Sequence, residues 1–131
     1  MKTVTYESLK AEHAWMIVSD QLQQRNNVLA KGISHMERSP AELPMASRLM
    51  ILRYHLKMSL RRLTQEARQQ ARTATDAEPL RRQWQHVHQL MFLLRQIDTE
   101  LDQAALENDM FRSWLCSLSN RVYRSSLISL N

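Results

Sequence analysis

The most regular stretch of the sequence is residues 79–107, PLRRQWQHVHQLMFLLRQIDTELDQAALE. Its apolar residues recur every three, four or seven positions, which at about 100° per residue places them on one face of an α-helix. The pattern predicts an amphipathic helix with a narrow apolar seam of the kind found in coiled coils and helical bundles. The seam consists of Leu80, Trp84, Val87, Met91, Leu94, Leu101 and Ala105, flanked by Leu90 and Ile97.

The same spacing occurs in three other segments. It predicts long helices over about 6–37 and 45–75 and a shorter one over about 109–126. In the first segment only Arg25 interrupts the apolar seam. We expect Asp109 to be the N-cap of the last segment if the chain bends at Asn108-Asp109.

Prolines mark the breaks between these segments. Pro40 and Pro44 lie between the first and second segments, where each disfavours helix at the residue before it. Pro79 opens the third segment, where its missing N–H costs little. We therefore expect an all-α fold: an antiparallel bundle of three long helices plus a shorter C-terminal helix, forming one domain over residues 1–131.

Composition supports this interpretation and bounds the function. The chain has 131 residues, of which 44% are hydrophobic, with one glycine and three prolines. No window approaches the roughly 18 uncharged apolar residues of a membrane span, and the first six residues do not resemble a secretory signal. The single cysteine, Cys116, lies between Leu115 and Leu118, which predicts a small helix-packing residue in a reducing compartment. We expect a cytoplasmic protein.

The positive charge is concentrated in one part of the chain. The formal net charge is +5, yet residues 45–82 alone contain nine Lys or Arg and three Asp or Glu, a net charge of +6. Five of these bases fall within an arc of about 100° on the second predicted helix and form a stripe about 28 Å long. The stripe consists of Arg53, Lys57, Arg61, Arg68 and Arg72.

Three roles are open for this stripe. It could be a solvated face or pair with the acidic segment Asp98–Asp109, on this copy or on a second copy of the chain. It could bind an acidic protein, because arginine suits carboxylates and phosphates equally well. It could also contact a nucleic-acid backbone without reading base sequence.

Apolar residues outside the seams indicate an interface. A three-helix core does not obviously bury them, and exposed apolar patches of such extent mark sites of protein association. We expect them to bind a partner or a second copy. These residues are Leu9, Met16, Ile17, Ile51, Tyr54 and Met58.

The sequence lacks the usual signals of catalysis. None of the five histidines pairs with another at a spacing of three or four, and the single glycine cannot build a phosphate-binding loop. We expect no catalytic residue, cofactor or metal, and therefore no enzyme. The preferred function is a non-enzymatic adaptor, chaperone or small structural subunit of a cytoplasmic protein complex. The alternative is a helical nucleic-acid-binding subunit that uses the basic stripe.

Overall fold

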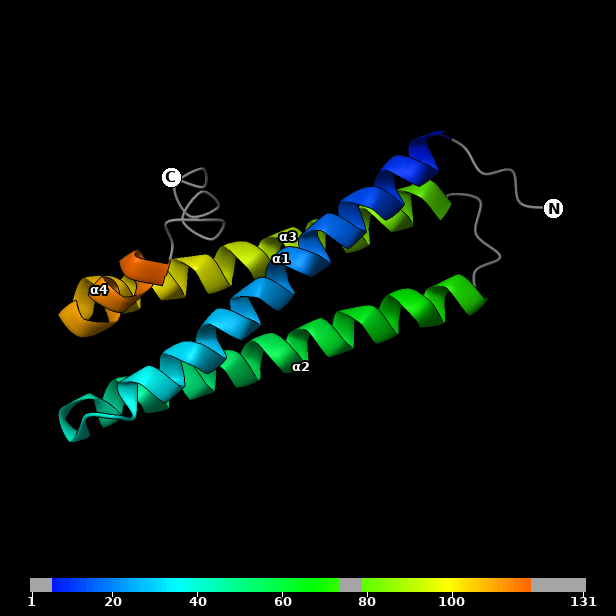
Figure 1. The fold of residues 1–131 in the computed structure, drawn as a ribbon. Coiled ribbons are helices and arrows are strands. Elements are labelled where there is room, and N and C mark those ends of the chain that lie inside the picture. The colour runs from blue at the N-terminus through cyan, green and yellow to red at the C-terminus, as the bar shows by residue number, and fades with distance from the viewer. Residues whose placement is uncertain (1–5, 74–78, 119–131) are drawn as a thin grey trace.

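The protein is an all-α antiparallel bundle, seen here in a computed structural model that describes residues 6–73 and 79–118 (Figure 1). Its elements are α1 (Tyr6–Met36), the short 3₁₀ turn η1 (Pro40–Glu42), α2 (Leu43–Thr73), α3 (Pro79–Glu107) and α4 (Asp109–Leu118). The described residues contain no β-strand. The predicted fold class is confirmed.

The helix α1 packs against both α2 and α3, which also pack against each other. Figure 1 shows α1 running obliquely across the α2/α3 pair, with α4 folded back beside the end of α3. Because α1 covers one side of this pair, the surface on the opposite side is formed by α2 and α3 alone. This asymmetry positions the groove described below.

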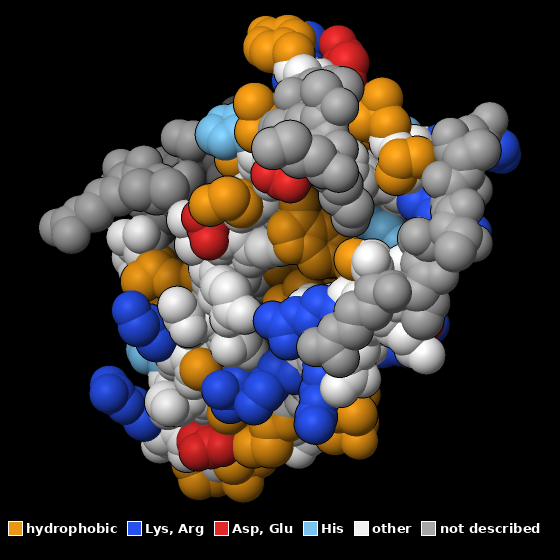
Figure 2. All heavy atoms as spheres, turned by 90° about the vertical axis from the view of Figure 1, so that its right-hand side faces the viewer, with side chains coloured by type: hydrophobic (Ala, Val, Ile, Leu, Met, Phe, Trp, Pro, Cys, Tyr) orange, Lys and Arg blue, Asp and Glu red, His pale blue; other side chains and the backbone are white. Residues whose placement is uncertain are grey.

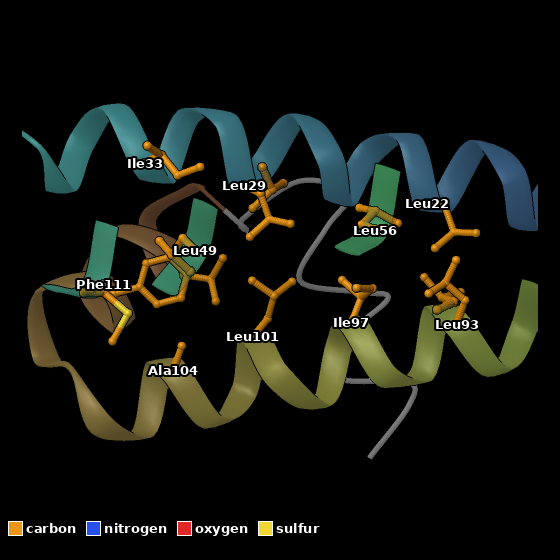
Figure 3. Packing of buried hydrophobic residues seen from close by; sticks show 14 of the residues in the cluster. Leu22, Leu29, Ile33, Leu49, Leu56, Leu93, Ile97, Leu101, Ala104 and Phe111 are labelled. Carbon is orange, nitrogen blue, oxygen red and sulfur yellow. The ribbon is translucent and has the colours of Figure 1, made fainter. Parts of the chain in front are cut away.

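The core is built largely from the predicted seams, but on α3 the buried face also includes Leu93 and Ala104, whereas the predicted seam residues Leu80, Trp84, Met91 and Ala105 are only partly buried. Leu22 and Leu29 of α1, Leu56 of α2, and Ile97 and Leu101 of α3 are all fully buried. Figure 3 shows these side chains pointing toward one another between the helices. Burying each such side chain stabilises the fold by about 1.5–3 kcal/mol relative to an exposed position, so the seams supply the main driving force for the bundle.

The boundary between α1 and α2 differs from the expected one. The helix α2 begins at Leu43, two residues earlier than predicted, so Pro44 lies inside the helix. Proline is tolerated there because the first N–H groups of a helix have no intrahelical acceptor. The turn η1 precedes it, with Pro40 at its first position.

The chain bends at Asn108, and the cap of α4 is Asn108 rather than the predicted Asp109. The Asn108 Oδ1 accepts a hydrogen bond of 2.8 Å from the backbone N–H of Phe111, as an N-cap side chain does. The Asn108 Nδ2 also donates to Glu42 Oε2 at 2.6 Å, which ties this corner to η1. The expected continuation to residue 126 lies outside the described residues.

Close approach of α4 requires the glycine of α1. A Cβ atom on Gly32 would lie 3.1 Å from Cζ3 of Trp114 and 3.3 Å from Cε1 of Phe111. Phe111 is fully buried against the core. The helix α4 therefore closes one end of the bundle by packing aromatic rings onto a flat part of α1. In contrast to the prediction, Cys116 is exposed and does not belong to the buried set.

Arg25, which interrupts the first seam, is an integral part of the core. Its Nε and Nη2 donate to the two carboxylate oxygens of Asp98 on α3, at 2.8 and 3.1 Å. Both residues are buried. A bidentate ion pair of this kind offsets the cost of burying either charge alone and fixes the register of α1 against α3.

Candidate protein-binding groove

An open groove runs between α2 and α3. It consists of two neighbouring depressions with volumes of about 760 Å³ and about 380 Å³. All their lining residues belong to α2 or α3, and none to α1. We call this the α2/α3 groove.

The two depressions form one continuous groove because His55, Phe92 and Gln96 line both of them. Along α2 the groove reaches from Pro44 to Glu66, which at 1.5 Å per residue is about 33 Å. It is therefore long enough for a helix of about 22 residues.

Two large apolar side chains stand at the rim of this groove. Ile51 on α2 is 71% exposed, and Phe92 on α3 is 64% exposed. The next residues along the outer face of α2, Tyr54 and Met58, are also exposed but do not line the groove. An apolar strip therefore extends from the groove onto the outer face of α2.

The other predicted partner-binding residues lie elsewhere. Leu9, Met16 and Ile17 are exposed on α1, and none of them lines the α2/α3 groove. Met16 instead lines a separate depression of about 380 Å³ that also includes Trp15. The six predicted residues are therefore divided between α1 and α2, and only Ile51 lines the α2/α3 groove.

Phe92 was missing from the predicted set. It lies next to Met91, outside the seam of residues 79–107. Ile51 was selected because it is a large apolar residue that faces away from its seam, and the same criterion selects Phe92. Met50 and Leu43 satisfy the same rule on α2 and are also exposed. What the pattern could not show is that Phe92 lies across the groove from α2.

The basic stripe lies on the side of α2 that faces α1. Lys57, Arg61 and Arg68 line a polar depression of about 430 Å³ together with Asn26 of α1. Arg53 donates from Nε to Asn26 Oδ1 at 3.1 Å. Figure 2 shows Lys and Arg side chains gathered in the lower half of one end of the molecule, at the height of α2. The side chain of Arg72 lies outside the described residues.

The acidic segment pairs with other residues. Asp98 binds Arg25, Glu107 binds Arg48 at the start of α2, and Asp109 binds Arg112 within α4. Within residues 6–71 and 79–118, no ion pair joins this segment to Lys57, Arg61 or Arg68. Intramolecular pairing with the acidic segment therefore does not account for this part of the stripe.

Two carboxyl groups of the acidic segment have shifted pKa values. Burial, and then the charge of Asp98, raises the pKa of Asp102 above its ordinary value. Hydrogen bonds from Gln103 and then Arg48 lower the pKa of Glu107. Burial thus causes the first shift and side-chain hydrogen bonds cause the second, and neither carboxyl group lines the α2/α3 groove.

Neither a metal-binding cluster nor a membrane-spanning helix is found in the described residues. His55 and His88 both line the groove, but no cluster of three or more His, Cys, Asp or Glu side chains in residues 6–73 and 79–118 could hold a metal ion. No helix in the same residues is long and apolar enough to cross a bilayer.

No protein-family model matches the chain, and neither a curated protein nor a solved structure shows a significant match to it.

Proposed function

We propose that this protein is a non-enzymatic adaptor, chaperone or structural subunit that binds another protein through the α2/α3 groove. The observation that carries the proposal is the exposure of Ile51 and Phe92 along a continuous groove on the side of α2 and α3 that α1 leaves open. Two antiparallel helices with an apolar groove are the usual receptor for a further helix, which completes a four-helix arrangement. We further propose a cytoplasmic location, where the exposed thiol of Cys116 would stay reduced.

The proposal is tested by placing a charge in the groove. Ile51→Asp and Phe92→Asp should each abolish binding of the partner, because a carboxylate would have to be desolvated at the centre of the contact. The matched control is Leu106→Asp, since Leu106 is 70% exposed on α3 but does not line the groove. Binding is measured by co-purification of the full chain from its native host after photo-crosslinking from position 96, which lines both depressions and is unchanged in every variant.

The expected result is a crosslinked partner that both groove variants lose and Leu106→Asp retains. Circular dichroism checks that each variant keeps its helix content. Retention of the same partner by both groove variants would show that this groove is not the binding surface.

A second candidate function is backbone binding to a nucleic acid. The observation in its favour is that Lys57, Arg61 and Arg68 line one depression and form no ion pair with the described acids. Asn26 and Gln65 add amide groups that could contact phosphate or sugar.

This candidate predicts salt-dependent binding of single-stranded RNA or DNA. Because each phosphate contact contributes about 0.7 to the slope of log affinity against log salt, the Lys57→Glu/Arg61→Glu/Arg68→Glu variant should lose about 2 from that slope. Fluorescence anisotropy with a labelled oligonucleotide measures this. Arg112→Glu on α4 is the control, and equal slopes for both variants would exclude the candidate.

A further inference from the structure

We propose that the basic side of α2 binds single-stranded nucleic acid, with phosphates along the polar depression between α1 and α2 and a base stacked on Tyr54. This inference rests on the second candidate function above and adds to it the kind of strand and a base contact. It concerns a different surface from the α2/α3 groove, so it does not depend on the protein-binding proposal.

The depression between α1 and α2 gathers positive charge that no described acid neutralises. Lys57, Arg61 and Arg68 line it from α2, and all three are exposed. Within residues 6–71 and 79–118 none of them forms an ion pair, and no Asp or Glu of these residues lines the depression. The three bases lie along about 17 Å of helix. Because like charges at this spacing repel one another, a bound polyanion stabilises the arrangement.

Neutral donors complete the lining. Gln23 and Asn26 contribute side-chain amides from α1, and Gln65 contributes one from α2. Arg53 donates from Nε to Oδ1 of Asn26 at 3.1 Å, so the amide nitrogen of Asn26 is the atom left to donate. Bases together with amide donors are the groups that proteins use to bind phosphate and sugar oxygens.

The scarcity of apolar side chains argues against an acidic protein in this depression. Of its nine lining residues only Leu56 and Leu60 are apolar, and Leu56 is fully buried in the core. Protein interfaces take most of their binding energy from apolar or aromatic side chains near the centre of the contact. Contacts with a nucleic-acid backbone are polar and charged, and they need no such centre.

An exposed aromatic ring lies beside these bases. Tyr54 is 67% exposed, and among the described residues it takes part in no ring contact. It precedes Lys57 by three residues and Arg61 by seven, so around α2 it lies about 60° and about 20° from them. Tyr54 is not in the lining, but it lies on the same side of α2, about one turn before Lys57.

The ring and the bases together select a single strand. Proteins that bind single strands combine a basic track for the backbone with aromatic side chains on which bases stack. Tyr54 lies about 4.5 Å along α2 from Lys57, within reach of a base whose phosphates follow Lys57 and Arg61. The bases of a duplex are stacked on one another and do not offer their faces to such a ring. Because every base has a π-face, the contact does not read sequence.

The experiment compares probes that share a backbone but differ in their bases. A single strand of about 12 thymidines, an abasic strand with the same phosphates and a duplex of the same length each carry fluorescein. The full chain is titrated into each probe, and anisotropy gives Kd at low and moderate salt. We expect the thymidine strand to bind about tenfold more tightly than the abasic strand, because stacking contributes on that order per base. It should also bind more tightly than the duplex.

Variants assign the base contact to Tyr54. Tyr54→Ala should weaken binding of the thymidine strand about tenfold, to the level of the abasic strand, and leave the salt dependence unchanged. Tyr54→Phe, which keeps the ring, should bind as the unmodified protein does. Tyr6→Ala is the matched control, because Tyr6 is 71% exposed on α1 but Lys10 Nζ lies over its ring, 4.5 Å from the centroid. Circular dichroism checks that each variant keeps its helix content.

The base contact and the backbone contact fail separately. Equal affinity of the thymidine and abasic strands, tighter binding of the duplex, or unchanged binding of thymidines by Tyr54→Ala would overturn this inference. The second candidate function would still stand if Lys57→Glu/Arg61→Glu/Arg68→Glu removed salt-dependent binding of the abasic strand. If no probe binds, both fall.

Competition separates other anionic partners. Vesicles containing phosphatidylserine and a polyglutamate peptide are each added to the complex with the thymidine strand, at the same concentration of negative charge. We expect neither to displace the strand, because neither supplies a base to stack on Tyr54. Displacement by either one would assign the surface to a lipid or to an acidic protein and overturn the inference.

Discussion

Arg25 places a guanidinium in the apolar face of α1, at a position where the seam would otherwise hold a hydrophobic residue. The bidentate bond to Asp98 resolves this conflict, because Nε donates to Oδ1 and Nη2 donates to Oδ2. A buried ion pair of this type adds little net stability compared with apolar residues of similar volume. The pair instead fixes the register of the two helices, since α1 cannot slide along α3 without separating two buried charges.

Removing one partner should therefore be far more damaging than replacing both. We expect Asp98→Asn to lower the free energy of unfolding by about 3–5 kcal/mol, because it leaves the Arg25 charge buried without its carboxylate. The double variant Arg25→Met/Asp98→Leu should recover most of this loss. Urea denaturation followed by circular dichroism measures both. A double variant as unstable as the single one would show that the pair itself stabilises the fold.

At the scale of the element, α4 is a short helix held by a few contacts. It begins at the Asn108 cap, buries Phe111 and Leu115, and lays Trp114 against Gly32 of α1. A helix of ten residues has little stability of its own, so these tertiary contacts hold it in place. The position of α4 therefore depends on the absence of a side chain at residue 32.

A large residue at position 32 should displace α4 without unfolding the three long helices. Gly32→Leu inserts a side chain where a Cβ alone is already close to Trp114 and Phe111, and overpacking of this kind costs about 1–3 kcal/mol. Hydrogen exchange should rise in residues 109–118 and stay unchanged in the middle of α1 and α3. Lys31→Leu, at the exposed neighbouring position, is the control. Unchanged protection of α4 in Gly32→Leu would contradict this view of the contact.

At the scale of the whole molecule, stability and proposed binding depend on different side chains. The buried leucines that hold the bundle together face inward from α1, α2 and α3. Ile51 and Phe92 face the open groove and are largely exposed. The exposed side chains at the rim of the groove are therefore ones that folding does not require.

Substitutions in the groove should accordingly leave the fold intact. We expect Ile51→Asp and Phe92→Asp to change the free energy of unfolding by less than about 0.5 kcal/mol, as surface substitutions usually do. Thermal and urea unfolding of the isolated protein measure this. A loss of about 2 kcal/mol or more in either variant would place these side chains in the core instead.

Much of this architecture follows from local sequence. The periodicity of residues 79–107 predicts a helix, and α3 occupies those residues. The same rule marks Ile51, Tyr54 and Met58 as residues that face away from the seam, and all three are exposed. It treats Arg25 as an interruption, because the partner Asp98 lies 73 residues away in the chain. It also assigns the α4 cap to Asp109 instead of Asn108, a local error of one residue.

The sequence by itself determined that the chain folds as long amphipathic helices with their breaks near the prolines, because a 3.6-residue period and the geometry of proline are local properties. Only the tertiary structure decided which helix faces meet. It paired Arg25 with Asp98, let α4 approach Gly32, and left the α2/α3 groove open while α1 covered the other side. These outcomes depend on packing three helices at once, and the spacing of residues within one helix carries no information about its neighbours.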